Sequence, residues 1–201
     1  MHMQTIGFLG VPQASAEAQK MFDEDIAELG YVMNVSRLWA YQPATVAGLF
    51  ALVAEANAGE CLSLRQRAIL VTACASAFGD SYCALAWGSK LASASDPHTA
   101  AAVVHGADHG LSGNERAMAG WARKVAMDPS GTTGADVQEL RDAGFTDPQI
   151  FTMTVFVALR LAFSTVNDAL GLGPDAGLWV TAPASLREAV TFGRPIEETA
   201  P

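Results

Sequence analysis

The sequence predicts an all-α fold, and three observations support this prediction. Capping boxes, in which a serine or threonine and a glutamine or glutamate three residues later satisfy the free amides of a first helical turn, occur at Ser63 and Gln66, Ser112 and Glu115, and Thr146 and Gln149. Apolar residues recur at spacings of three and four through most of the chain. No segment shows sustained alternation of apolar and polar residues, so no strand is predicted.

The N-terminal half is expected to contain four helices. Those at 13–29 and 43–58 follow from the spacing of their apolar residues, and each precedes a glycine, which suits the left-handed conformation of a helix end. The helix at 63–78 begins at the first capping box, and the helix at 81–95 follows a one-glycine turn. These last two form an antiparallel hairpin, which we place at the centre of a helical bundle.

The C-terminal half is expected to contain five more helices, at 97–105, 113–127, 134–143, 147–171 and 184–191. Their starts are marked by the remaining two capping boxes and by Asp96 and Asp147, which are capping acids followed by proline. Residues 172–201 are rich in glycine and proline near both ends and are expected to form a C-terminal arm or a loose terminus. We treat residues 1–201 as a single domain.

Composition excludes several classes of function. The formal net charge of −9 argues against nucleic acid as a partner, because a phosphate-binding surface needs clustered lysine and arginine. Three cysteines without paired spacing do not predict a secreted disulfide framework, and the N-terminus lacks the pattern of a signal peptide. We therefore expect a protein of the reducing cytoplasm.

The most apolar stretch, from Ile150 to Phe163, is interrupted by Arg160 and is shorter than the roughly 18 apolar residues of a membrane span. It predicts a buried helix and no membrane partner. The positive mean hydropathy of +0.21 indicates apolar surface that a second copy of the chain would cover. A homo-oligomer is expected.

The segment from Leu62 to Trp87 carries the most specific pattern. Its helix, glycine turn and second helix place Asp80, Cys83 and Trp87 along one face, since spacings of three and four bring helical side chains together. The segment resembles the carboxymuconolactone decarboxylase and alkylhydroperoxidase D-like (AhpD-like) family. In that comparison Leu62, Ser63 and Arg65 match the family's helix start, and Cys83 matches the second cysteine of its Cys-x-x-Cys pair.

Three positions differ from the redox members of this family. Ala68 replaces a glutamate, Asp80 replaces the first cysteine and Trp87 replaces a histidine. The usual relay needs two sulfurs that close a disulfide, and this chain cannot close one at the usual place. The resemblance continues through segments beginning at Leu111, Ala143 and Asp168 and implies an all-helical trimer or hexamer that uses no cofactor and no metal.

Candidate site residues follow from the hairpin and from this resemblance. Cys83 occupies the third helical position, where the helix dipole favours a thiolate and the nearby Asp80 opposes one, so the direction of the pKa shift stays open. Cys74 is either a displaced resolving cysteine or a small residue that lets the helices approach. Tyr82 donates a hydrogen bond to a bound oxygen or packs in the core, and Trp87 walls an apolar pocket or belongs to the core.

Other polar residues are weaker candidates. Arg160, the only charge in its apolar stretch, requires an acidic partner, either Asp80 or an acid of another subunit. A metal site at His98, His105, Asp108 and His109 is disfavoured against exposed or capping histidines. Cys61 lies in a loop and is expected to be exposed or half-buried.

Three functions remain open, and the first is favoured. In the first hypothesis, the chain is a divergent oxidoreductase with peroxiredoxin-like antioxidant chemistry, in which Cys83 reacts with a hydroperoxide or thiol. Alternatively, it is a cofactor-free decarboxylase, lyase or isomerase that uses Asp80 and Tyr82 as acid and base on a small molecule. The third hypothesis is a non-catalytic helical oligomer.

Overall fold

A computed structural model of the chain describes residues 5–59 and 62–196. Within these ranges the protein consists of eleven α-helices, one short 3-10 helix and a hairpin of two very short strands. The all-α prediction is therefore confirmed. Cys61 lies outside the described residues.

The elements follow one another along the chain as a nearly continuous series. They are β1 (Thr5–Ile6), β2 (Leu9–Gly10), α1 (Ala16–Leu29), α2 (Asn34–Trp39), α3 (Pro43–Ala58), α4 (Leu64–Phe78), α5 (Ser81–Ala94), α6 (Pro97–Val104), α7 (Gly113–Met127), η1 (Pro129–Gly131), α8 (Gly134–Asp142), α9 (Asp147–Ala169), α10 (Ala176–Thr181) and α11 (Ala184–Ala189).

The predicted helix starts are confirmed at α4, α7 and α9, each of which has both hydrogen bonds of a capping box. Asp96 caps α6 as predicted, because its carboxylate accepts hydrogen bonds from the amides of His98 and Thr99. The expectation for Asp147 is wrong. Thr146 caps α9, and Asp147 instead accepts a hydrogen bond from Nε of Arg141 at 2.8 Å.

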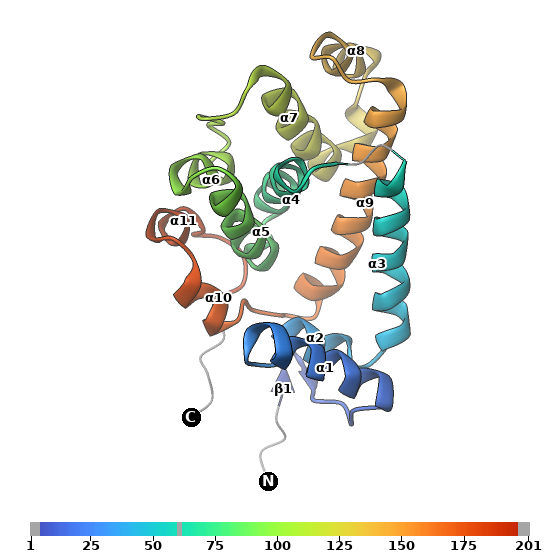
Figure 1. The fold of residues 1–201 in the computed structure, drawn as a ribbon, viewed down its shortest axis with the longest axis vertical. Helices are drawn as coiled ribbons and strands as arrows, with labels where there is room; N and C mark the ends of the chain where they lie inside the picture. The colour runs from blue at the N-terminus through green and yellow to red at the C-terminus, as the bar shows by residue number, and fades with distance from the viewer. Residues whose placement is uncertain (1–4, 60–61, 197–201) are drawn as a thin grey trace.

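Helix α4 lies at the centre of the molecule and packs most extensively against α5 and α7 (Figure 1). Helix α9 runs beside α3 and also contacts α4 and α7. By length and composition α9 resembles a membrane span, yet it buries Met153, Phe156 and Arg160 among its neighbours. The prediction of a buried helix is thus confirmed, and α9 brings its arginine into the core.

The structure adds elements that the sequence pattern did not reveal. Helices α2 and α10 have six residues each, too few to show a periodic apolar face, and β1 pairs with β2 through only two residues each. The segment after Gly171 is not loose within the described residues. Helices α10 and α11 pack against α5, α11 also packs against α6, and Leu172 and Leu186 are fully buried.

Candidate active site

The turn between α4 and α5 sets the position of Cys83. Gly79 adopts a left-handed conformation with φ of 89°, which glycine reaches without steric cost, and its amide donates to the Ala75 carbonyl. Asp80 then caps α5, because its Oδ1 accepts a hydrogen bond from the Cys83 amide at 2.9 Å. Cys83 is therefore held at the third residue of α5.

Two side chains of α9 point their donors at the sulfur of Cys83. Nη2 of Arg160 lies 3.4 Å from Sγ, and the Ser164 hydroxyl oxygen lies 3.6 Å from it. These residues are four apart on one helix and so project from the same face. Cys83 itself is 1% exposed, so the contacts are made in a dry environment.

The charge environment resolves the open question about the Cys83 thiol. Burial raises the pKa of this thiol above its ordinary value, the negative charge of Asp80 raises it further, and Arg160 acts in the opposite direction. The thiol is therefore protonated at neutral pH. Removal of the sulfur from water outweighs the favourable position near the start of a helix.

Asp80, the residue that caps α5, is completely buried. Its Oδ2 has no hydrogen-bond partner within residues 5–59 and 62–196, and the residue does not line the adjacent cavity. Asp80 thus contacts the amide of Cys83 rather than the space in which a substrate binds.

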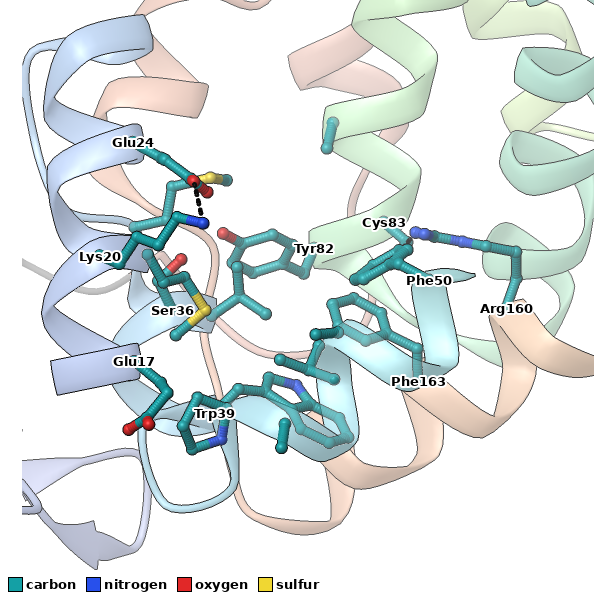
Figure 2. Close-up of a pocket in the computed structure, with 18 of the residues that line it drawn as sticks. Glu17, Lys20, Glu24, Ser36, Trp39, Phe50, Tyr82, Cys83, Arg160 and Phe163 are labelled. Carbon is teal, nitrogen blue, oxygen red and sulfur yellow. Dashed lines mark hydrogen bonds and ion pairs between the residues drawn. The ribbon is translucent and has the colours of Figure 1, made fainter. Parts of the chain in front are cut away.

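A cavity of about 640 Å³ opens beside Cys83, between α1, α2, α3, α5 and α9 (Figure 2). Its walls are mostly apolar, and Cys83, Tyr82 and Arg160 are among the polar groups that reach it. The aromatic rings that line it are Trp39, Phe50, Tyr82, Trp87 and Phe163. A cavity of this size and character is typical of a site for a small molecule.

Of the three residues predicted to share a face, Cys83 and Trp87 line the cavity and Asp80 does not. The cavity also contains residues that the sequence did not single out, notably Phe50 and Phe163, and Ser164 contacts the sulfur. Only the contact of Ser164 with the sulfur had a signal in the sequence, because Ser164 lies four residues after Arg160 and so shares its helix face.

Arg160 has aromatic partners instead of the expected acidic one. Its guanidinium carbon lies 5.5 Å from the ring centre of Phe50, 5.3 Å from that of Trp87 and 5.0 Å from that of Phe163. Within the described residues Arg160 forms no ion pair, with Asp80 or with any other acid. The expectation of an acidic partner in the same chain is therefore not met.

Tyr82 lines the cavity and is 3% exposed. Its hydroxyl donates to Oδ2 of Asp175 at 2.5 Å, and Oδ1 of Asp175 accepts from the Asn34 amide at 2.7 Å. Burial and the nearby carboxylate raise the pKa of Tyr82, so its hydroxyl keeps its proton at neutral pH.

Cys74 and the histidines do not line the cavity. Sγ of Cys74 donates to the Val71 carbonyl at 3.4 Å, burial raises the pKa of its thiol to about 12, and no disulfide joins Cys74 to Cys83. Asp108 pairs with Arg123. Among the residues that the structure describes, no three histidine, cysteine or acidic side chains are grouped to hold a metal.

Comparisons with solved structures identify the fold. A peroxidase-related protein with an alkylhydroperoxidase AhpD core from Ralstonia eutropha JMP134 matches with a TM-score of 0.78 and 23% identity, over 88% of this chain and 96% of that one. A peroxidase-related protein from Silicibacter sp. TM1040 matches with a TM-score of 0.75 and 24% identity, over 88% and 95%.

The debrominase Bmp8 is a third similar structure. A cysteine-to-alanine variant of it in complex with 2,3,4-tribromopyrrole matches with a TM-score of 0.68 and 15% identity, over 90% of this chain and 97% of that one. No family model and no curated protein matches the chain. At these identities the comparisons show the fold, and they confirm the AhpD-like fold that the sequence predicts.

Proposed function

Given a chain with the AhpD-like helical fold, we propose that it is a thiol-dependent oxidoreductase that reduces a small organic hydroperoxide at Cys83. One observation carries this proposal. The sulfur of Cys83 lies at the wall of a large apolar cavity, with the donors of Arg160 and Ser164 directed at it. These two donors lower the pKa of the Cys83 thiol against the larger effects of burial and Asp80, so they favour the small fraction of thiolate, which is the reactive form of cysteine.

The proposed reaction needs a single cysteine. The thiolate of Cys83 attacks the outer oxygen of the hydroperoxide, so that a sulfur–oxygen bond forms and the oxygen–oxygen bond breaks. Cys83 is oxidised to a sulfenic acid, the hydroperoxide is reduced to an alcohol, and the proton released by the thiol ends on the leaving oxygen. Arg160, next to the sulfur, stabilises negative charge on both sulfur and oxygen during this step.

Reduction then requires an external thiol. A first small thiol condenses with the sulfenic acid to form a mixed disulfide and water, and a second restores the Cys83 thiol and leaves as a disulfide. An external donor is favoured over Cys74, because Cys74 does not line the cavity and its thiol donates a hydrogen bond to the Val71 carbonyl of its own helix.

The similar structures support the class of substrate. Two are named as peroxidase-related proteins, and the debrominase variant binds a small halogenated aromatic ring. In this chain the corresponding support is the cavity of about 640 Å³, lined largely by aromatic and aliphatic side chains. A small apolar molecule fits such a lining better than a sugar or a nucleotide does.

A cofactor-free lyase or isomerase is the second candidate, and the contact between Tyr82 and Asp175 is the observation that favours it. Tyr82 lines the cavity and neither Asp80 nor Asp175 does, so Asp175, which accepts the hydrogen bond of the Tyr82 hydroxyl, replaces Asp80 as the acid that acts through Tyr82 in this alternative. Its activity would survive loss of the Cys83 thiol.

Trapping of sulfenic acid tests the proposal directly. Under limiting cumene hydroperoxide and with dimedone present, we expect the adduct on the peptide that contains Cys83, detected by mass spectrometry. Cys83→Ser should lower the rate of hydroperoxide consumption by roughly a hundredfold or more, as expected when a nucleophile is lost.

Cys74→Ser is the matched control, because it removes a buried thiol from the same hairpin. It should leave the rate of the first oxidation step unchanged. Hydroperoxide consumption by Cys83→Ser at the parent rate would contradict the proposal.

A further inference from the structure

We infer that the substrate of the Cys83 site is an apolar molecule with one carboxylate, and that Arg160 binds this carboxylate. The inference rests on the proposed function, because it names the class of molecule that reaches the same site. Its basis is the state of the Arg160 guanidinium, which is buried, lines the cavity and has one nitrogen, Nε, without a hydrogen-bond partner within the described residues.

Most of the hydrogen-bonding capacity of Arg160 is unused. A guanidinium has five N–H donors in a planar fork. Nη2 contacts the Cys83 sulfur, which is a weak acceptor, and Nε is buried without any partner within residues 5–59 and 62–196. The residue is only 5% exposed, so most of its surface contacts protein rather than solvent.

The aromatic rings around Arg160 hold the guanidinium without neutralising it. Phe50, Trp87 and Phe163 present rings at 5.0 to 5.5 Å from the guanidinium carbon, and their π electrons attract the charge but offer no lone pair in the plane of the fork. A buried arginine normally has a carboxylate or phosphate partner, because removing a cation from water is costly. The missing acceptor therefore comes from a ligand or from an acid of another subunit, and the place of Arg160 in the cavity lining favours a ligand.

Asp80 contacts Cys83, but it does not act as the acidic partner of Arg160. It forms no ion pair with Arg160, its Oδ1 accepts from the Cys83 amide, and it does not line the cavity. Arg160 does line the cavity. In Figure 2 its side chain extends from α9 toward Cys83, so a carboxylate held by Arg160 lies close to the sulfur.

The charges around the cavity match a ligand with one negative charge. Lys20, Lys90 and Arg160 line it together with Glu17 and Glu24, which leaves three cations against two acids. Lys20 is already paired with Glu24 at 3.9 Å on the α1 side (Figure 2). Of these five charged residues only Arg160 is buried, beside Cys83, and most of the uncharged lining residues are apolar.

Direct binding of two matched probes tests the inference without any redox step. Phenylbutyrate and phenylbutanol share the same apolar body and differ in charge, and their affinities are measured by calorimetry on the parent protein. Quenching of tryptophan fluorescence gives a second readout, since Trp39 and Trp87 line the cavity. We expect the acid to bind roughly tenfold to a hundredfold more tightly than the alcohol, the range for a charge-assisted contact.

Variants of Arg160 then locate the contact. Arg160→Met should abolish the preference for the acid, and Arg160→Lys, which keeps the charge but loses the planar fork, should retain part of it. Arg187→Met is the matched control, because Arg187 also lies over a tryptophan ring, 5.8 Å from that of Trp179, but does not line the cavity. The Arg187→Met protein should prefer the acid over the alcohol as strongly as the parent protein does.

Two results would overturn the inference. One is equal affinity for acid and alcohol, or binding of neither, in the parent cavity, a measurement that does not depend on the folding of an Arg160 variant. The other is a preference for the acid that persists in a folded Arg160→Met protein. Because the probes carry no peroxide, failure here leaves the oxidation of Cys83 untouched, and failure of that oxidation leaves the binding result intact.

Discussion

The reactivity of Cys83 depends on two charged side chains that act in opposite directions. Asp80 and burial raise the pKa of its thiol, and Arg160 lowers it. The thiolate fraction is thus set by the neighbours of the residue and not by its position on the helix alone.

The substitution Asp80→Asn tests this balance. Asparagine still caps α5, but the loss of the negative charge should lower the pKa of the Cys83 thiol and raise its alkylation rate at neutral pH severalfold. The pH profile of the reaction with iodoacetamide, followed by mass spectrometry of the Cys83 peptide, should shift to lower pH. Asp168→Asn, at a half-buried aspartate that does not contact Cys83, should leave the profile in place. An unshifted profile in Asp80→Asn would contradict the electrostatic role given to Asp80.

Tyr82→Phe tests the second polar contact at the cavity. Loss of the hydroxyl leaves Oδ2 of the buried Asp175 without its donor, so the free energy of unfolding should fall by about 1–3 kcal/mol in urea titrations. In Tyr41→Phe the lost hydroxyl, which donates to the Gly10 carbonyl, is exposed, and the fall should be smaller. Equal losses in the two variants would show that burial of Asp175 does not matter.

At the scale of elements, local hydrogen bonds define the helix ends and a few long-range contacts orient the helices. The start of α4 is tied to the start of α7 by Arg65 and Glu115, whose Nε and Oε1 atoms lie 2.6 Å apart. Glu115 also accepts from the Ser112 amide in the capping box. The hydrogen bond from Arg65 lowers the pKa of Glu115 to about 2.

Glu115→Gln should separate these two roles, because glutamine keeps the capping box and loses the charge. A lowered pKa stabilises the folded protein above the ordinary pKa of 4.5, and this contribution is lost as the pH falls toward 2. At neutral pH the variant should be less stable by about 1 kcal/mol, since the pair is partly exposed. Thermal unfolding measured from neutral pH down to acid should show the difference disappear; Glu139→Gln, at an exposed position, is the control. A difference that does not change with pH would contradict this explanation.

Helix starts are the part of the fold that local sequence patterns predict well. Capping boxes at Ser63, Ser112 and Thr146 involve residues three apart, so their hydrogen bonds are predictable without the rest of the fold. Helix α2 was not predictable from its own six residues, yet it brings Trp39 to the cavity, where the indole nitrogen donates to Oδ1 of Asn167 at 2.9 Å. That bond spans 128 residues of the chain and has no local signature.

At the scale of the whole molecule, large apolar side chains remain exposed on the two helices that flank the cavity. Leu52 and Phe50 on α3 are 54% and 40% exposed, and Phe151 on α9 is 71% exposed. Helices α3 and α9 lie side by side (Figure 1). We propose that further copies of the chain cover part of this exposed apolar surface, around Leu52 and Phe151, in keeping with the trimer or hexamer expected from the sequence resemblance.

Light scattering or sedimentation measures the oligomeric state. The parent protein is expected to assemble, and Leu52→Glu or Phe151→Glu should lower the mass of the assembly because each places a charge in the proposed contact. Val180→Glu, at a side chain that is 74% exposed on α10, should leave the mass of the assembly unchanged. A monomeric parent protein would contradict the proposal.

The amino-acid pattern predicts the helical class, most helix boundaries, the hairpin that turns at Gly79 and the place of Cys83 at the third residue of α5. These features depend on neighbours within about four residues, so local geometry is sufficient to predict them. The packing of distant helices, by contrast, brings Arg160, 77 residues away, to the Cys83 sulfur, keeps Asp80 outside the cavity and makes burial the largest influence on the pKa of the thiol. Desolvation and long-range contacts arise only when distant helices pack together, and no pattern within a single helix contains that information.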